Sequence, residues 1–350
     1  MADPIRVGLA GIGRAGWGMH CGELAKYPDQ FQLVAACDTE QSRLDLMAEK
    51  YACATYTDFA EMVQDPDVDL VSVATRSPEH TPHAILALAA GKYVFLEKPV
   101  ALSYAQALEL KAVADRFPGK LFLRHNRRFE PCFNHIQEII ASGKIGEPYE
   151  FKLRRHGYQR RDDWQTIIAC GGGQLNNWGP HIVDHALRFL EAPVAEIWSD
   201  LKKIAAVGDA EDHLKVVLRG ENGRIVDLEI SGGVALSEPV YHIAGTRGAI
   251  RSVNEKTIEL KYLDPEQVLP EIEANPAPPP IKASFGNAEP LRWIEETLDT
   301  APAEGCNTGS IYGELYSAIR EGKPYRITLA EGLEVVRVTD VVKANSEFAS

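Results

Sequence analysis

The 350-residue sequence lacks the features that mark membrane, secreted and nucleic-acid-binding proteins. It contains no apolar run near the ~20 residues that span a bilayer, and it does not begin with a charged-then-apolar signal segment. Its six cysteines show neither CxxC nor Cys/His spacing, so we expect no metal site and reduced thiols in a cytoplasmic protein. A formal net charge of −13 disfavours nucleic acid and anionic membranes as partners. A small-molecule ligand is therefore the expected partner.

The first part of the chain alternates between predicted strands and helices. A hydrophobic content of 45% in a chain of this length is sufficient for two cores. Ser77-Pro78-Glu79 and Ser103 provide helix-start signals between the strands. Because strands covered on both faces are apolar almost throughout, we predict a doubly wound parallel sheet with strands at 6–11, 31–37, 69–75, 93–97 and 120–125.

The pattern changes after about residue 147, where short strands follow one another through short connections. Asn222-Gly223 is a strong hairpin signal, and 171–190 is predicted to form a helix packed on one face of an antiparallel sheet. We expect the other face of this sheet to be apolar and to mediate a dimer or tetramer. Segment 264–290 holds seven prolines and is expected to be a long surface loop. The sequence thus predicts an α/β (Rossmann) domain over 1–125 and an α+β domain for substrate binding and oligomerisation over 126–350.

A glycine-rich loop joins the first predicted strand to the first helix. There the glycines would let the backbone approach a pyrophosphate at a helix N-terminus. Asp38 ends the second strand, where a carboxylate accepts hydrogen bonds from an adenine-ribose 2′-OH and repels a 2′-phosphate. Arg43 is the nearby cation that can reduce the resulting preference for NAD over NADP. We expect NAD rather than NADP, bound by residues that include Gly11, Ile12, Gly13, Arg14, Ala15, Gly16 and Asp38.

Glu97 and Lys98 come directly after an apolar parallel strand and precede Pro99. Ligands of open α/β sheets bind beyond the carboxyl ends of the strands. A lysine at this position, next to a cofactor, can hydrogen-bond a substrate hydroxyl and stabilise a developing alkoxide. An exposed strand-end lysine without function is the alternative when Lys98 is considered alone.

Five motifs in this order, AGIGRAG, VAACD, AGKYVFLEKP, HNRRF and GGG…N…GPH..D, resemble those of the glucose–fructose oxidoreductase/inositol dehydrogenase (Gfo/Idh/MocA) family. The resemblance covers nearly the whole chain. It implies an open-faced antiparallel sheet in the second domain, a homodimer or homotetramer, and NAD(P)-dependent oxidation of a sugar, inositol or related polyol. Carried onto this sequence, it makes Lys98 the catalytic lysine. It also places the nicotinamide end of the cofactor beside Thr75, Arg76 and His80. Glu97 and Lys98 are likewise expected to contact the cofactor.

The segment after the three glycines provides the remaining catalytic candidates. Asn177, His181 and Asp184 have the spacing of one helical face. The family pattern has aspartate where this sequence has Asn177, and asparagine can orient a hydroxyl but cannot accept its proton. His181, with an ordinary pKa of about 6.5, can act as the base, and Asp184 would orient or polarise it. A core histidine in a buried helix is the alternative role for His181.

Upstream of the glycines, the stretch RRHGYQRRDDW carries arginines and Trp164 towards the same region. A sugar ring could stack on Trp164, and Arg154 could hold an acidic group of the substrate. Arginines clustered in this way also commonly form a solvated face. The expected substrate-binding residues are accordingly Lys98, Arg154, Trp164, Asn177 and His181.

Three functions remain open from the sequence. The first is an NAD-dependent dehydrogenase acting on a secondary alcohol of a sugar or cyclitol. The second is a lyase or glycoside-cleaving enzyme that keeps NAD bound and oxidises its substrate only transiently; the Asn177 departure favours it. The third is a dinucleotide-dependent sensor without catalysis, which the presence of Lys98 and His181 disfavours.

Overall fold

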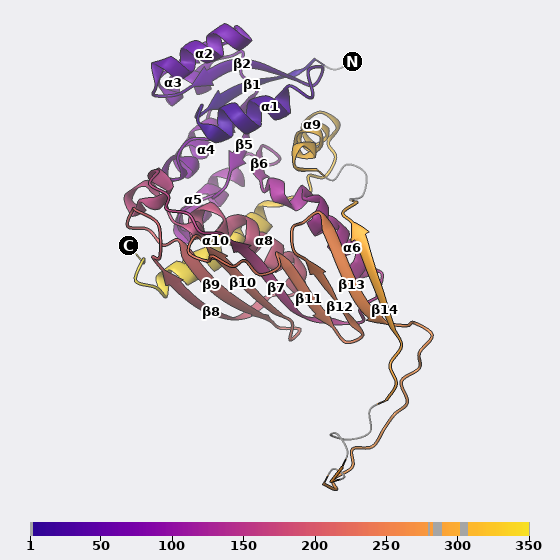
Figure 1. The fold of residues 1–350 in the computed structure, drawn as a ribbon. Coiled ribbons are helices and arrows are strands. Elements are labelled where there is room, and N and C mark those ends of the chain that lie inside the picture. The colour runs from indigo at the N-terminus through magenta and orange to yellow at the C-terminus, as the bar shows by residue number, and fades with distance from the viewer. Residues whose placement is uncertain (1–2, 279–280, 283–288, 302–306, 350) are drawn as a thin grey trace.

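The computed structural model describes residues 3–278, 281–282, 289–301 and 307–349 and has two sheets (Figure 1). The first is a parallel six-stranded sheet with the order β3-β2-β1-β4-β5-β6. This order, with helices packed around the strands, is that of a Rossmann-like fold. Its strands are β1 (Ile5–Ala10), β2 (Phe31–Cys37), β3 (Ala54–Tyr56), β4 (Leu70–Val73), β5 (Tyr93–Glu97) and β6 (Leu121–Arg124).

The helices of this first half connect the strands in chain order. The glycine loop enters a π-helical turn, η1 (Gly16–His20), that continues into α1 (Cys21–Leu24). Ser103 caps α5 as expected, because its side chain accepts a hydrogen bond from the Gln106 amide. The other helical elements up to the second sheet are α2 (Gln41–Tyr51), α3 (Phe59–Gln64), η2 (Ser77–Glu79), α4 (His80–Ala89), α5 (Tyr104–Ala114), η3 (Asn126–Phe129) and α6 (Pro131–Ala141).

The second sheet has eight strands in the order β14-β13-β12-β11-β7-β10-β9-β8, and its pairs are antiparallel except for β7 with β10. The predicted antiparallel sheet is therefore confirmed in the main, with one parallel pair at its centre. Its strands are β7 (Pro148–His156), β8 (Val194–Lys202), β9 (His213–Gly220), β10 (Ile225–Ser231), β11 (Tyr241–Gly245), β12 (Gly248–Ser252), β13 (Thr257–Leu263) and β14 (Trp293–Asp299).

The predicted helix over 171–190 is divided into two. It forms α7 (Gln174–Asn177) and α8 (Gly179–Leu190), preceded by the turns η4 (Trp164–Thr166) and η5 (Ile168–Cys170). Pro180 explains the break, since a proline removes one backbone donor and its ring collides with the carbonyl of the residue four positions earlier. The break separates Asn177 from His181, which a continuous helix would have placed one turn apart.

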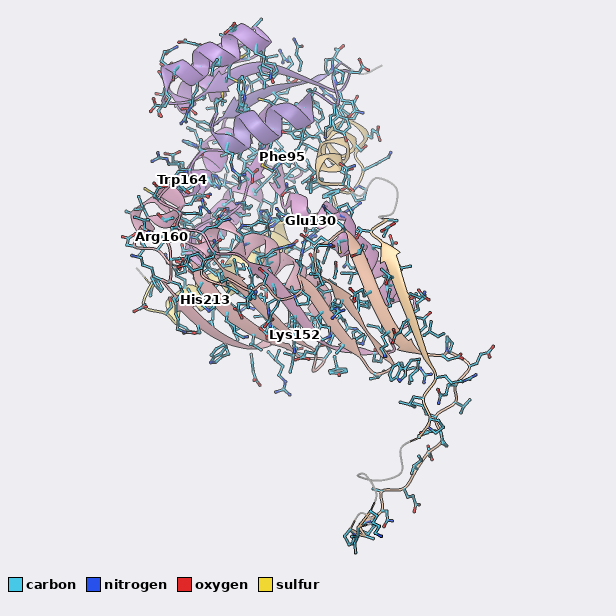
Figure 2. The ribbon with its side chains drawn as sticks, in the orientation of Figure 1. Phe95, Glu130, Lys152, Arg160, Trp164 and His213 are labelled. Atoms are coloured by element: carbon cyan, nitrogen blue, oxygen red, sulfur yellow. The ribbon has the colours of Figure 1, made fainter. Side chains whose placement is uncertain are left out.

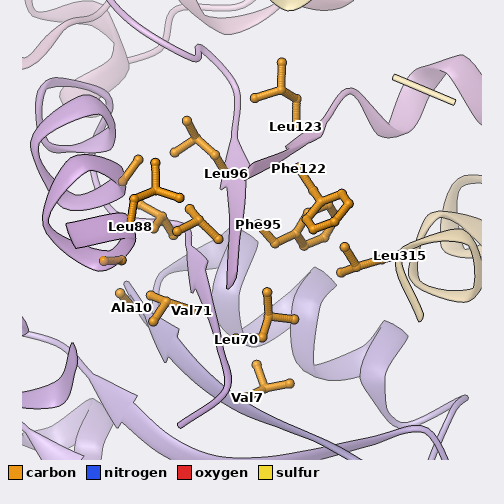
Figure 3. Close-up of a cluster of buried hydrophobic side chains, with 14 of the residues drawn as sticks. Val7, Ala10, Leu70, Val71, Leu88, Phe95, Leu96, Phe122, Leu123 and Leu315 are labelled. Carbon is orange, nitrogen blue, oxygen red and sulfur yellow. The ribbon is translucent and has the colours of Figure 1, made fainter. Parts of the chain in front are cut away.

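The C-terminal helices return to the first sheet. Tyr312 and Leu315 of α9 (Ile311–Glu321), which follows η6 (Thr308–Ser310), are fully buried in the same core as Val7, Leu70 and Phe95 (Figure 3). Helix α10 (Leu329–Ala344) begins at the predicted Thr328–Glu331 capping box and contributes side chains to both cores. The division of the chain at residue 125 thus stays a prediction, and the last helices join the two halves.

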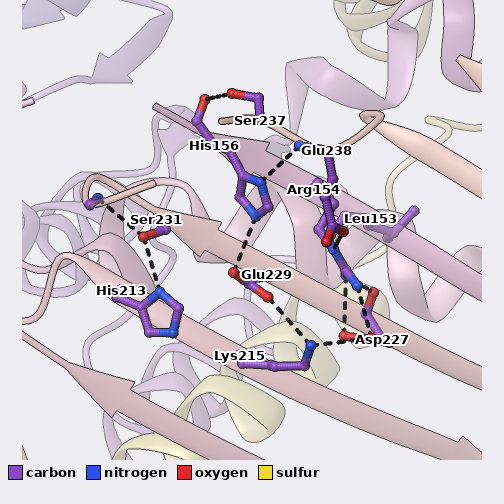
Figure 4. Close-up of polar contacts among 11 residues, drawn as sticks. Leu153, Arg154, His156, His213, Lys215, Asp227, Glu229, Ser231, Ser237 and Glu238 are labelled. Atoms are coloured by element: carbon purple, nitrogen blue, oxygen red, sulfur yellow. Dashed lines mark hydrogen bonds and ion pairs between the residues drawn. The ribbon is translucent and has the colours of Figure 1, made fainter. Parts of the chain in front are cut away.

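One face of the second sheet is covered by α8, α6 and α10, and no helix among the described residues covers the other, which we call the uncovered face (Figure 1). We expected this uncovered face to be apolar, and that expectation is wrong. Its side chains form ion pairs between neighbouring strands, such as Lys215–Glu229 (Figure 4). Arg251–Glu259 and Lys261–Glu295 are two further pairs. The strands are apolar only at alternate positions, as in antiparallel sheets with one solvated face.

Two further features lie at the ends of strands. The Asn222-Gly223 turn joins β9 to β10, and Gly223 has the positive φ of 81° that the turn requires. The described residues on both sides of the predicted 264–290 loop extend away from the body (Figure 1), and residues 279–280 and 283–288 of that loop lie outside the described part of the chain. Among the described residues, no helix has both the length and the apolar character needed to cross a membrane.

Candidate active site

The glycine loop has the shape of a phosphate cradle. Gly11 has a φ of +87°, and a Cβ atom there would lie 2.4 Å from the Ala74 carbonyl oxygen. A Cβ atom on Gly16 would lie 2.0 Å from the Gly11 carbonyl oxygen, so neither glycine tolerates a side chain. Gly13 has no atom within 4 Å of its Cβ position, which leaves its backbone open to approach. This combination fits a dinucleotide pyrophosphate, with exposed Arg14 beside it.

Asp38 lies at the end of β2, as the sequence predicts. Its buried carboxylate accepts hydrogen bonds from the amides of Ile12 (2.7 Å) and Glu40 (3.0 Å). The half-exposed Arg43 guanidinium lies 3.3 Å from both carboxylate oxygens. The carboxylate is thus held against the glycine loop, where it can meet a ribose hydroxyl. Arg43 is the cation nearest to any 2′-phosphate at that point.

The loop after β4 is tied to the loop after β5 through His80. The His80 ring contacts the carbonyl oxygens of Pro99 (2.7 Å) and Thr75 (3.0 Å). Both ring nitrogens are therefore occupied, and His80 positions the two loops instead of offering a nitrogen to the cofactor. Arg76 remains available, and its guanidinium lies 5.9 Å from the centre of the Trp164 ring. This contact joins the first half of the chain to the 157–171 segment of the second half.

Lys98 leaves β5 and reaches the break between α7 and α8. Its Nζ donates to the Asn177 carbonyl oxygen at 3.1 Å and lies 3.5 Å from the Asn177 side-chain oxygen. Burial lowers the pKa of Lys98 to about 8, with Arg14 and Arg127 adding repulsion and Glu97 opposing it. Lys98 and Asn177, predicted to act on one substrate, are therefore in direct contact.

Glu97 is part of a buried ionic network behind Lys98. Its carboxylate pairs with Arg124 at 2.5 Å and lies 3.3 Å from the His20 ring. Arg124 pairs in turn with Glu23 at 2.7 Å, and His20 contacts the Tyr312 hydroxyl at 2.7 Å. We predicted that Glu97 lies beside the cofactor. Its carboxylate is instead engaged by these contacts, which hold the end of β5 in place.

His181 lies in the first turn of α8 and is 8% exposed. Its Nδ1 atom is buried and has no hydrogen-bond partner among the described residues. Burial, followed by repulsion from Lys98 and Arg127, lowers the pKa of His181 well below its ordinary value. The ring is therefore neutral at physiological pH and able to accept a proton.

Asp184 does not contact His181 in the way we expected. Its carboxylate forms a two-bond ion pair with Arg128, at 2.6 and 2.8 Å. Although burial favours the protonated form, these bonds hold the pKa of Asp184 below its ordinary value. Arg128 also pairs with Glu331 of α10, so Asp184 belongs to a buried network that fastens α8. Asp184 lies on the same helix as His181, as the spacing predicts, but its carboxylate binds Arg128 and not His181.

His185 is structural. Its ring stacks on Phe133 with 3.8 Å between the ring centres. One ring nitrogen lies 2.9 Å from the Arg127 carbonyl oxygen, and the other lies 3.2 Å from the Tyr241 hydroxyl. These contacts fix α8 against η3.

Arg154 lies on the uncovered face of the second sheet, away from α8 (Figure 4). Its guanidinium pairs with Asp227 (2.9 Å) and Glu238 (2.8 Å). The prediction that Arg154 binds substrate is therefore wrong, because successive residues of a strand point to opposite faces. Its neighbour Arg155 points towards α8, and its guanidinium lies over Trp178.

Trp164 and Arg160 belong to the segment before the glycines, at the side where the two sheets approach (Figure 2). Gln165, next to Trp164, donates to the Asn177 side-chain oxygen at 3.3 Å. This contact ties the segment to the residue that Lys98 holds. Trp164 therefore lies close to the predicted pocket.

Sequence reasoning missed several residues that surround this site. Arg127 stacks over Trp178 at 4.1 Å and forms an ion pair with Glu130. His125 is 2% exposed and lies directly after β6. Both belong to HNRRF, a motif that carried the family resemblance but gave no role to its individual residues. Glu211, which accepts a hydrogen bond from the Leu175 amide at 2.9 Å, carried no sequence signal because it comes from a connection between strands.

Two family models match the chain. The oxidoreductase family model with an NAD-binding Rossmann fold matches residues 5–125, and the GFO/IDH/MocA C-terminal domain matches residues 133–251. The chain is 24% identical to scyllo-inositol 2-dehydrogenase (NADP(+)) of Bacillus subtilis, covering 99% of this chain and 94% of that one. It is 29% identical to myo-inositol 2-dehydrogenase of Thermotoga maritima, covering 73% and 78%.

A solved structure shows the same fold. The putative oxidoreductase yvaA of Bacillus subtilis has a TM-score of 0.81 at 20% identity, over 100% of this chain and 97% of that chain. The two family models, the parallel first sheet and the mostly antiparallel second sheet agree with the motifs found along the sequence. The chain belongs to the Gfo/Idh/MocA family of oxidoreductases.

Proposed function

We propose that this protein is an NAD-dependent dehydrogenase that oxidises a secondary alcohol of a sugar, inositol or related polyol. The observation that carries the proposal is the contact of Lys98 Nζ with Asn177, beside His181, at the carboxyl end of β5. The inositol dehydrogenases among its relatives support the substrate class.

The cofactor would lie over Gly11, Gly13 and Gly16, with its adenine ribose at Asp38. Asp38 supports NAD, because its carboxylate would face a 2′-phosphate with like charge. The Bacillus relative is named for NADP(+), and Arg43 could bind a 2′-phosphate. The affinities for NAD and NADP are therefore both to be measured. When bound, NAD supplies the acceptor for the hydride.

Each residue of the site has a separate task in the proposed reaction. Lys98, largely an ammonium at pH 7, donates a hydrogen bond to the reacting hydroxyl and stabilises negative charge on its oxygen. His181, which is neutral, takes the hydroxyl proton through a ring nitrogen. The Asn177 side chain orients the hydroxyl, and Trp164 with Arg76 closes the side of the pocket. Asp184 acts only through Arg128, by holding α8 in place.

The experiment is a panel of sugars, inositols and sugar acids incubated with NAD or NADP, followed at the absorbance of the reduced nicotinamide. Stoichiometric reduced cofactor with one substrate class supports the dehydrogenase. Repeated turnover without net reduced cofactor indicates transient oxidation, as in a lyase or glycoside-cleaving enzyme. Cofactor binding without any turnover indicates a sensor. We also propose that the protein acts in the cytoplasm as a homodimer or homotetramer.

A further inference from the structure

Helix α7 is held at both of its ends by residues from elsewhere in the chain. At its last residue, the Asn177 carbonyl oxygen accepts a hydrogen bond of 3.1 Å from Lys98 Nζ. At its start, the main-chain carbonyl oxygen of Glu211 accepts from the Gln174 amide at 3.1 Å, and its carboxylate accepts from the Leu175 amide at 2.9 Å. Only one helical turn separates the two ends. We therefore expect a change at one end of α7 to reach the other.

The Glu211 carboxylate is built closely into the start of α7. Glu211 is 6% exposed, and a Cβ atom on Gly173 would lie 2.2 Å from Oε1 and 2.3 Å from Oε2 of that carboxylate. Gly173 directly precedes the first residue of α7, so the lack of a side chain there lets the carboxylate reach the first turn. The third glycine of the run at 171–173 thus makes room for Glu211.

Glu211 comes from a connection that is itself bonded to the surroundings of the site. This connection, residues 203–212, joins β8 to β9. The Ala210 amide donates to the Thr166 carbonyl oxygen at 3.0 Å, two residues after Trp164. The Asp212 carboxylate accepts hydrogen bonds from three amides of the same connection, those of Ile204, Ala205 and Ala206. The connection is thus fixed on both sides of the residue that binds α7.

We propose that Glu211 is a positioning residue, which holds the first turn of α7 so that Asn177 stays in contact with Lys98. The proposal rests on the role given to Lys98 in the proposed function. Lys98 Nζ lies 3.1 Å from the main-chain oxygen and 3.5 Å from the side-chain oxygen of Asn177, so a movement of α7 displaces both oxygens. A displacement of ~1 Å in a group that orients the reaction can lower the rate by about 100-fold.

The first test compares turnover in variants of Glu211 on the substrate found in the panel. Glu211→Met keeps most of the side-chain volume but removes the acceptor, so kcat should fall by about 10- to 100-fold with the affinity for NAD unchanged. Glu211→Gln, whose amide oxygen can still accept the Leu175 bond, should restore most of kcat. Asp209→Ala is the matched control, because it removes a carboxylate–amide bond of 2.8 Å that the same connection makes to Ile168 and not to α7. It should leave kcat unchanged.

A double-mutant cycle tests whether Glu211 acts through Lys98. If it does, Glu211→Met should cause little further loss of kcat in protein that already carries Lys98→Met. A purely structural role gives independent losses that add. Unchanged kcat in folded Glu211→Met, additive losses in the cycle, or an equal loss in Asp209→Ala overturns the proposal.

Hydrogen exchange provides a measurement that needs neither activity nor a variant of Glu211. Coupling between two sites is reciprocal, so Lys98→Met should also loosen the start of α7. In the full-length protein, the amides of Gln174 and Leu175 should exchange at least about 5-fold faster in Lys98→Met than in the wild type. Mass spectrometry with fragmentation of the peptides resolves these amides.

Equal exchange rates in the two proteins overturn the proposal, even where Glu211→Met does not fold. If the wild type oxidises no polyol, the proposed function fails, whereas hydrogen exchange still decides whether the two ends of α7 are coupled.

Discussion

The side chain of Lys98 donates a hydrogen bond of 3.1 Å to the main-chain carbonyl of Asn177, at the point where α7 ends. The carbonyl is available because the His181 amide, its usual intrahelical donor, bonds instead to the Trp178 carbonyl oxygen at the break between α7 and α8. A residue of the first sheet is thereby fastened to the helical segment that carries the proposed base. The geometry of the site depends on this contact between the two halves of the chain.

Replacing Lys98 by methionine removes the donor and keeps most of the volume of the side chain. We expect turnover to fall by about 10² or more, the scale for losing one preorganised hydrogen-bond donor, with cofactor affinity within a few-fold of the wild type. Cofactor titration by fluorescence and the initial rate on the substrate found in the panel provide the two values. Unchanged turnover would remove Lys98 from the mechanism.

His181→Ala should abolish oxidation while cofactor binding is retained, because it removes the proposed base. Asn177→Asp should keep some activity and add an ionisation to the pH–rate profile, since aspartate titrates and asparagine does not. Asp184→Asn should mainly lower thermal stability, because it leaves Arg128 buried beside a neutral partner. An active His181→Ala together with an inactive Asn177→Ala would assign the proton to a different base.

Asp38→Ser should narrow the difference in affinity between NAD and NADP. The substitution removes the like charge that would face a 2′-phosphate and leaves Arg43 free of its 3.3 Å partner. Dissociation constants for both cofactors, measured for the wild type, Asp38→Ser and Asp38→Ser/Arg43→Ala, separate the two contributions. Equal constants in the wild type would contradict the preference for NAD.

We predict that the folding stability of the protein depends on pH through Glu211. Burial raises the pKa of this carboxyl from 4.5 to about 7, although the Leu175 amide and Lys343 oppose the shift and Asp212 adds to it. The folded state therefore holds the proton more tightly than the unfolded chain. Folding stability falls as the pH rises from about 4.5 to 7, by an amount on the order of 3 kcal/mol.

Glu211→Gln cannot ionise, so the melting temperature of the variant relative to wild type should rise between pH 5 and pH 8. Thermal unfolding of both proteins at several pH values gives this difference. Glu221→Gln, at an exposed turn, is the matched control and should show no trend. A difference that is independent of pH would show that Glu211 does not titrate in this range.

The oligomer proposed for this protein has a different physical basis from the one that we expected. The uncovered sheet face is charged, whereas the segment after β13 exposes Val268 (86%) and Ile272 (71%). Burial of these side chains in a second copy would stabilise an assembly. Light scattering at micromolar concentration should give a multiple of 38.6 kDa, reduced in Val268→Asp/Ile272→Asp. A monomeric wild type would refute the oligomer.

Much of the first sheet could be predicted from the sequence, because each of its long strands is apolar and Ser103 marks the start of one of the helices between them. Strand β3 was missed, since it has three residues of which two are exposed. The second sheet could be predicted only as a series of short strands, because each strand alternates over a short length. Local patterns of this kind carry little information about pairing partners.

The candidate site was predicted residue by residue, but its contacts were not. Motifs placed Lys98, Asn177 and His181 in one predicted site, and the structure brings Lys98 to Asn177. They could not show that Asp184 pairs with Arg128 or that His80 has both nitrogens occupied, because those partners lie far away in the sequence. Arg154 shows the same limit, since a shift of one residue along a strand moves a side chain to the opposite face.

The burial of Tyr312 and Leu315 among the strands of the first sheet has a consequence for the order in which the protein forms. Domains commonly fold in sequence as the chain leaves the ribosome, the N-terminal one first. Here the N-terminal sheet lacks part of its interior until nearly the whole polypeptide has been made. The first segment to be synthesised must therefore wait for one of the last before its core is closed.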